Sequence, residues 1–116
     1  MAGRISSILH QLWSAAPAAE IIVTGVTDTF VTAVPFADPL FQAANTALKE
    51  AAAANRARFA DPFPIFNPQG DLNAEVQAIC TLTLLCTQSD SHPSDAGYQT
   101  LGGVIFEVSG YARLLE

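Results

Sequence analysis

Asp90 and His92 are the two residues of this sequence whose types and spacing could do chemistry, and they stand two apart in the segment DSHPSDAGY. When a polar loop curls, an aspartate in this position can accept a hydrogen bond from one imidazole nitrogen and fix the tautomer of the ring. The other nitrogen then faces outward as a general base. The alternative is a solvated loop in which Asp90 and Asp95 are ordinary capping residues.

Two helices are expected to position this loop. Asp71 or Asn73 is predicted to cap a helix that runs to about Leu84, and the polar loop follows that helix. Ser94 is predicted to cap a last helix over residues 95–115. The pair therefore lies where one helix has ended and the next one begins.

Upstream of these helices, helical spacing of apolar residues alternates with short runs of β-branched residues. Helices are predicted over residues 3–16 and 40–56, the second with Asp38 as its N-cap. Buried parallel strands are predicted over residues 20–26 and 57–61. Helices that alternate with strands are typical of an α/β layer structure.

The fold class predicted is therefore α/β, as a single domain over residues 1–116. We expect a partial three-layer fold, with few parallel strands, flanking helices and a loop over residues 63–70. Two strands make a marginal sheet, whereas a doubly wound domain usually has about five or six. We therefore expect the sheet to be completed by oligomerisation or by a complementary chain.

Composition excludes several classes of function. Half of the 116 residues are hydrophobic, 14% are charged and the formal net charge is −6. So much apolar surface excludes a disordered chain. Five Lys and Arg residues in total cannot form a basic stripe, so no nucleic-acid partner is expected. No apolar run reaches the roughly 18 residues that span a bilayer, so no membrane span is expected either.

Cys80 and Cys86 leave two states open. A spacing of six puts side chains on different faces of a continuous helix, so a disulfide would need the helix to end between them. The alternative is a pair of buried thiols. Two cysteines without a clustered pair of histidines do not make a zinc site, and we expect neither a metal nor a cofactor.

The longer pattern Asp-Ser-His-Pro-Ser-x-x-Gly-Tyr resembles the C-terminal block of the SGNH (GDSL) esterase and lipase family. The similarity extends upstream to Ala-Pro-x-Ala-x-Ile-x-Val-Thr-Gly, the Ala-rich helix, Phe-Ala-Asp and the paired cysteines, and so to nearly the whole chain. The resemblance implies a partial SGNH-like, flavodoxin-like fold. It also implies that His92 is the base of a Ser-His-Asp triad, that Asp90 orients it, and that the substrate is a small ester.

The chain departs from the family at the nucleophile. It contains no Gly-Asp-Ser, since Gly70-Asp71 is followed by Leu72, and it contains no Gly-x-Asn-Asp. The sequence therefore resembles the part of such an enzyme that follows the third block, with the base and its orienter but no recognisable nucleophile. Helix positions, capping or poor geometry make each remaining serine a weak candidate; these are Ser6, Ser7, Ser14, Ser89, Ser91, Ser94 and Ser109.

The sequence thus predicts a carboxylic ester hydrolase of SGNH type, whose nucleophile comes from an unrecognised residue or from another chain. The alternative is a non-catalytic, truncated remnant that acts as an oligomerising or partner-binding module. Thr24, Thr27 and Asp28 lie at the end of the first strand, where α/β sites gather, but a strand-end turn explains them better. His10 is expected at the surface. The first residues show no signal-peptide pattern, and the cellular location stays open.

Overall fold

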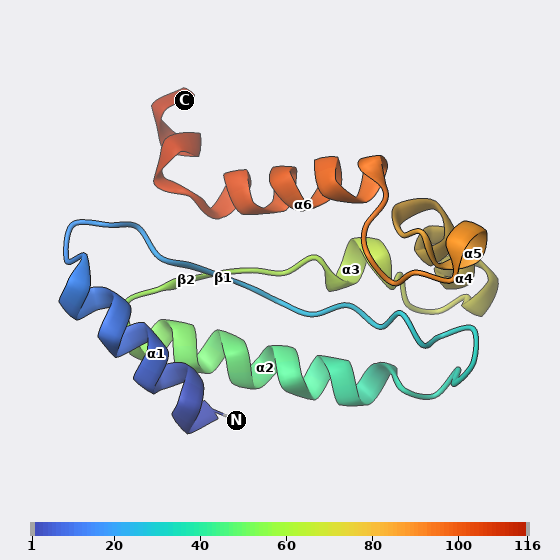
Figure 1. Cartoon of the computed structure of the whole chain (residues 1–116), viewed down its shortest axis with the longest axis horizontal. Coiled ribbons are helices and arrows are strands. Elements are labelled where there is room, and N and C mark those ends of the chain that lie inside the picture. The colour runs from blue at the N-terminus through green and yellow to red at the C-terminus, as the bar shows by residue number, and fades with distance from the viewer. Residues whose placement is uncertain (1, 116) are drawn as a thin grey trace.

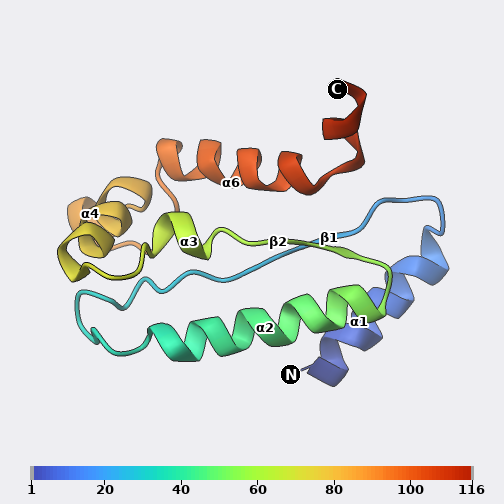
Figure 2. The same cartoon turned by 180° about the vertical axis from the view of Figure 1, so that it is seen from behind.

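Two short parallel strands form the centre of the fold, and helices lie on both sides of them (Figures 1 and 2). The computed structural model describes residues 2–115. Along the chain the elements are α1 (Ala2–Ala15), β1 (Ile22–Thr24), α2 (Asp38–Ala54), β2 (Arg58–Ala60), α3 (Phe63–Phe66), α4 (Leu72–Leu82), α5 (Leu85–Gln88), α6 (Asp95–Val108) and the 3-10 helix η1 (Gly110–Leu115).

The sheet confirms the predicted α/β class with parallel strands and flanking helices. α6 packs on one face of the sheet, α2 packs on the other, and α1 packs on α2 (Figure 1). Both strands are shorter than the predicted ranges 20–26 and 57–61. Beyond β1 the side-chain amide of Asn45 takes the place of a neighbouring strand. It accepts a hydrogen bond from the Val26 N–H at 2.7 Å and donates one to the Val26 carbonyl at 2.8 Å.

Two helix starts are capped as the sequence predicts. The Asp71 carboxylate accepts a hydrogen bond from the backbone N–H of Asn73 at 2.9 Å, at the start of α4. The Ser94 hydroxyl accepts one from the N–H of Gly97 at 3.2 Å, at the start of α6. These side chains satisfy N–H groups that have no partner inside the helix.

The prediction that Asp38 is an N-cap is wrong. Ala37 occupies the N-cap position, and Asp38 is the first residue of α2, followed by Pro39 in the first turn. The Asp38 carboxylate accepts a hydrogen bond from the Gln69 side chain at 2.8 Å, and no side-chain bond caps this helix. The Asp38 carboxylate therefore bonds to Gln69, which is distant in the sequence, and not to a backbone N–H of its own helix.

The loop predicted over residues 63–70 and the polar loop predicted before Ser94 are also shorter than expected, because each contains helical residues. α3 forms inside the first because the Asp61 carboxylate accepts a hydrogen bond from the Phe63 N–H at 3.0 Å. The single turn of α5 forms at the start of the second loop. Ser89 ends this turn in the left-handed conformation, with φ of 53°.

The last helix stops at Val108, not at residue 115 as predicted. The Arg58 guanidinium donates a hydrogen bond to the Val108 carbonyl at 2.6 Å, and the Glu20 carboxylate accepts the Gly110 N–H at 2.8 and 3.0 Å. Arg58 and Glu20 also form an ion pair at 3.5 Å. These two side chains satisfy the end of α6, so the chain turns into η1.

The core nearest the polar loop is small. Val31, Phe66 and Ile79 are its fully buried members, and side chains of α4, α5 and α6 pack around them. This cluster fixes α4 against α6 and so supports the loop between them. Within residues 2–115, no helix combines the length and the apolar character that crossing a bilayer requires.

Candidate active site

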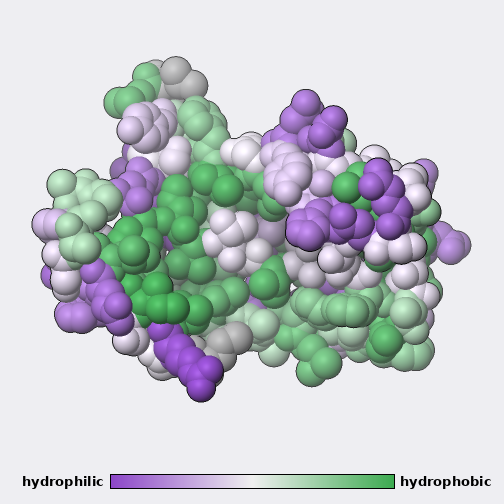
Figure 3. Space-filling view, viewed as in Figure 1, coloured by the Kyte–Doolittle hydropathy of each residue, from purple (hydrophilic) through white to green (hydrophobic). Residues whose placement is uncertain are grey.

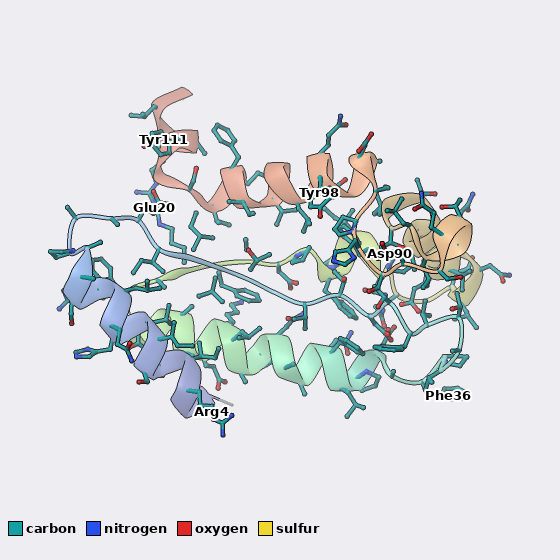
Figure 4. All side chains as sticks on the ribbon, viewed as in Figure 1. Arg4, Glu20, Phe36, Asp90, Tyr98 and Tyr111 are labelled. Atoms are coloured by element: carbon teal, nitrogen blue, oxygen red, sulfur yellow. A yellow bond between two sulfur atoms is a disulfide. The ribbon has the colours of Figure 1, made fainter. Side chains whose placement is uncertain are left out.

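The loop with Asp90 and His92 lies at the carboxyl end of the two strands. Both strands run toward the end of the molecule that holds α3, α4 and α5 (Figures 1 and 2). Figure 4 places Asp90 at this end, whereas Glu20 and Tyr111 lie at the opposite one. Functional sites of open α/β sheets gather at the carboxyl ends of the strands.

Backbone bonds tie this loop to the end of α4. The Leu84 N–H donates to the His92 carbonyl at 2.9 Å, and the Ser94 N–H donates to the Leu82 carbonyl at 3.0 Å. The Ser94 hydroxyl, which caps α6, donates to the Thr81 carbonyl at 2.7 Å. The end of α4 and the two residues after it therefore hold the backbone at His92 and at Ser94.

A close approach of α6 to α4 demands a glycine at position 97. Gly97 is buried, and a Cβ there would collide with the carbonyl oxygen of Leu82. That same carbonyl accepts the Ser94 N–H, so it has little room to move. Gly97 thus allows the first turn of α6 to seat directly on the chain that carries the histidine.

Cys80 and Cys86 form a disulfide that closes the base of the same loop. α4 ends at Leu82, between the two cysteines, which is the break in the helix that the sequence requires for a bridge. The disulfide joins α4 to α5, the turn from which the chain enters Ser89 and Asp90. Of the two states left open by the sequence, the structure has the bridged one.

The structure brings Asp90 and His92 together. His92 Nδ1 lies 2.5 Å from Asp90 Oδ1, and the same oxygen accepts the backbone N–H of His92 at 2.9 Å. These two hydrogen bonds, the backbone one first, hold the pKa of the Asp90 carboxyl below its usual range. The carboxylate is therefore ionised at neutral pH and holds the ring by Nδ1, which leaves Nε2 directed elsewhere.

Both side chains are open to solvent. The His92 side chain is 74% exposed and that of Asp90 is 41% exposed. Among residues 2–115, the only side-chain partner of the His92 ring is Asp90. The hydroxyls of Ser14, Ser94 and Ser109 donate to backbone carbonyls instead. The structure thus pairs His92 with Asp90, and among residues 2–115 no serine hydroxyl is hydrogen-bonded to the His92 ring.

The other residues singled out from the sequence do not join the pair. Thr24 is exposed at the end of β1, and His10 is exposed on α1. A hollow of about 440 Å³ lies between α2 and the carboxyl end of β2, and neither Asp90 nor His92 lines it. Asp28 is fully buried and accepts the Phe30 N–H at 2.8 Å, as a residue in a strand-end turn does.

Asp28 also belongs to a cluster of three acids that sequence reasoning missed. It faces Asp38 of α2, and Asp38 faces Glu75 of α4, which is only 3% exposed. Gln69 donates to the carboxylates of Asp38 and Glu75, at 2.8 and 3.1 Å. Asn67, fully buried, fixes the Asp28 backbone by donating to its carbonyl and accepting from its N–H.

Crowding of three carboxyl groups separates their pKa values. Burial, followed by hydrogen bonding to Asp38 and the charges of Asp38 and Asp28, raises the pKa of Glu75 to about 7. Burial also raises the pKa of Asp28. Burial acts in the same direction on Asp38, but the hydrogen bonds from Glu75 and Gln69 outweigh it and leave the pKa of Asp38 lowered. The pKa of Glu75 is therefore raised and that of Asp38 lowered, as expected for neighbouring carboxyl groups that compete for a proton.

No local signal could have revealed this cluster, because each acid has an ordinary explanation in sequence: a strand-end turn for Asp28, a helix start for Asp38 and a polar helix position for Glu75. Across the described residues, no group of three or more His, Cys, Asp or Glu side chains has an arrangement that could hold a metal ion. The cluster joins the segment that follows β1 to α2 and α4.

Comparison with known proteins gives no match: no family model, no curated protein and no solved structure is similar to this chain.

Proposed function

We propose that the chain supplies the base of a carboxylic ester hydrolase of SGNH type, with His92 as general base and Asp90 as its orienter. The contact between His92 Nδ1 and Asp90 Oδ1 is the observation that carries this proposal. The position of the pair at the carboxyl end of the strands, and the resemblance of the surrounding segment to the family's C-terminal block, support it further.

The chemistry follows from the orientation of the ring. Nε2 takes the proton of a hydroxyl group whose oxygen attacks the ester carbonyl, which gives a tetrahedral intermediate and an imidazolium. The Asp90 carboxylate stabilises the imidazolium through Nδ1–H. The imidazolium then gives its proton to the leaving alkoxide, and the carbon–oxygen bond to that alkoxide breaks. If the hydroxyl is that of water, these steps release the acid and the alcohol and complete the hydrolysis. If it is that of a residue outside the pair or of another chain, that residue is left acylated; Nε2 then takes a proton from water, whose oxygen attacks the acyl carbonyl, and the imidazolium returns the proton to the residue's oxygen as the acid leaves.

The test is hydrolysis of p-nitrophenyl acetate and p-nitrophenyl butyrate. We expect His92→Ala to lose at least about a hundredfold in rate, since general-base catalysis contributes roughly 10²–10⁴-fold. Asp90→Asn keeps the size of the side chain and removes its charge, so it should lose a smaller factor. His10→Ala is the matched control, because His10 is the other histidine and is exposed on α1. Equal rates for the wild type and His92→Ala would exclude the proposal.

A second function, that of an oligomerising or partner-binding module, is favoured by a separate observation. The outer side of β1 has no strand partner within residues 2–115, and large apolar side chains such as Ile8, Leu12 and Phe30 are about half exposed. An open edge beside exposed apolar surface is typical of a chain that associates. This function and the hydrolytic one do not exclude each other.

A further inference from the structure

The chain exposes more surface than its mass accounts for. Its accessible area is 7276 Å². A folded monomer of 12.2 kDa exposes roughly 6,100 Å² by the general scaling of area with mass. The excess is therefore roughly 1,200 Å², and obligate dimers bury roughly 1,000–2,500 Å² on each partner. The surplus area is similar in size to the area that one subunit of a stable dimer buries.

Exposed apolar residues gather where such an interface would form. Figure 3 shows them over the middle of one face, at the position of the strands and between α6 and α1. The large apolar residues that are 40% or more exposed include Ile8 and Leu12 of α1 and Val26 just after β1. These residues lie beside the open side of the sheet, so a partner seated there would cover them together.

The backbone of β1 determines which groups are open. Arg58 N–H donates to the Ile21 carbonyl at 2.9 Å and Gly25 N–H donates to the Ala60 carbonyl at 2.8 Å, so Ile21, Val23 and Gly25 face β2. In a strand, successive residues direct their N–H and C=O groups to opposite sides. The outward groups are consequently those of Ile22 and Thr24.

Asn45 limits this open edge to two residues. Its side chain already bonds both backbone groups of Val26, which is the next outward-facing residue. The remaining edge offers one N–H and one C=O from each of Ile22 and Thr24. A two-fold axis at Val23 places Ile22 of one copy opposite Thr24 of the other, as a hydrogen-bonded antiparallel pair. The four outward groups of each copy are then all satisfied by its own duplicate.

We propose that this edge and its apolar surroundings bind a second copy of the same chain, which makes a four-stranded sheet in the order β2-β1-β1-β2. An isologous contact of this kind closes at two subunits. Because the two β1 strands run antiparallel, the two Asp90–His92 pairs lie at opposite ends of the dimer and take no part in the contact. The inference deepens the second proposed function, as it names the partner, and it is independent of ester hydrolysis.

A single cysteine tests the position of the axis. The chain has no free cysteine among the described residues, so Val23→Cys adds one thiol per copy. In the proposed dimer the two Val23 residues form a non-hydrogen-bonded antiparallel pair, with Cα atoms about 4.5 Å apart. That separation lies within the range of about 4.4–6.8 Å that a disulfide spans. Thr87→Cys, exposed on α5 and distant from the edge, is the matched control.

We expect the wild-type chain to elute with twice its 12.2 kDa mass in size exclusion with light scattering. Under mild oxidation Val23→Cys should form a covalent dimer on a non-reducing gel, and Thr87→Cys should not. Thr24→Lys, which leaves the backbone intact and adds a charge at the edge, should weaken dimerisation at least about tenfold, whereas Thr87→Lys should not.

A wild-type chain that is monomeric at tens of micromolar would overturn the inference. A dimer that neither crosslinks through Val23→Cys nor responds to Thr24→Lys would overturn it too, because the contact would lie elsewhere, although the module function would stand. Ester hydrolysis is measured separately on the same wild-type and Thr24→Lys samples. If neither sample hydrolyses the ester, the hydrolase proposal fails and the dimer proposal is unaffected.

Discussion

Replacing Glu75 with Gln should make the protein more stable at alkaline pH and leave its stability in mild acid nearly unchanged. Gln has the size and the neutral state of a protonated Glu. Glu75 is 3% exposed and packs against Asp38, with Asp28 just beyond and Gln69 as its amide donor. The ionised form is disfavoured in that setting, and the variant cannot ionise.

The magnitude follows from the pKa of Glu75, which rises from its ordinary value of 4.5 to about 7. Between these values the folded chain binds the proton more tightly than the unfolded chain does, so stability falls as the pH rises through this window. The whole shift of the pKa corresponds to a loss of about 3 kcal/mol in the free energy of unfolding at a pH above the pKa of Glu75 in the folded chain. The buried proton therefore stabilises the fold below about pH 5, and its contribution is lost by about pH 8.

Urea unfolding of the wild type and of Glu75→Gln, at about pH 5 and about pH 8, measures this difference. We expect the variant to gain about 2–3 kcal/mol relative to the wild type at the higher pH and less than about 1 kcal/mol at the lower one. Glu50→Gln, exposed on α2, is the control and should change neither value. A difference between wild type and Glu75→Gln that is the same at both pH values would refute the reasoning.

Three further changes probe the support of the Asp90–His92 loop and of the turn at Asp28. Gly97→Ala should destabilise by more than about 2 kcal/mol in thermal or urea unfolding, because its Cβ meets the Leu82 carbonyl, whereas Gly102→Ala, where nothing lies within 4 Å, should gain up to about 1 kcal/mol. The paired variant Cys80→Ala with Cys86→Ala should lose about 2 kcal/mol from the short closed loop, and reduction of the wild type should reproduce that loss. Asn67→Ala should cost about 2–4 kcal/mol by leaving the Asp28 backbone unpaired; a near-neutral result would show that another group takes its place.

The features that the sequence predicted correctly are those with local causes. Ser94 and Asp71 cap helices because a side chain two or three residues away from an unpaired N–H is enough. The approach of Asp90 to His92 is also a local event, within a loop of a few residues. The α/β class follows from the spacing of apolar residues, which one element sets by itself.

The features that the sequence did not predict depend on distant partners. α6 ends at Val108 because Glu20, which lies 90 residues before Gly110, and Arg58 satisfy its last turn. Asp38 does not cap α2 because Gln69, 31 residues later, donates a hydrogen bond to its carboxylate. Neither partner has a spacing that a local pattern could reveal.

The central claim is that Asp90 holds the Nδ1 side of His92 and leaves Nε2 free to take a proton. Long-range ¹H–¹⁵N NMR of the histidine ring, with the imidazole neutral, tests this claim most directly. The structure predicts the Nδ1–H tautomer for His92 and a return toward the Nε2–H form, which free imidazole side chains favour, in Asp90→Ala. An Nε2–H tautomer in the wild type, unchanged in Asp90→Ala, would contradict the account.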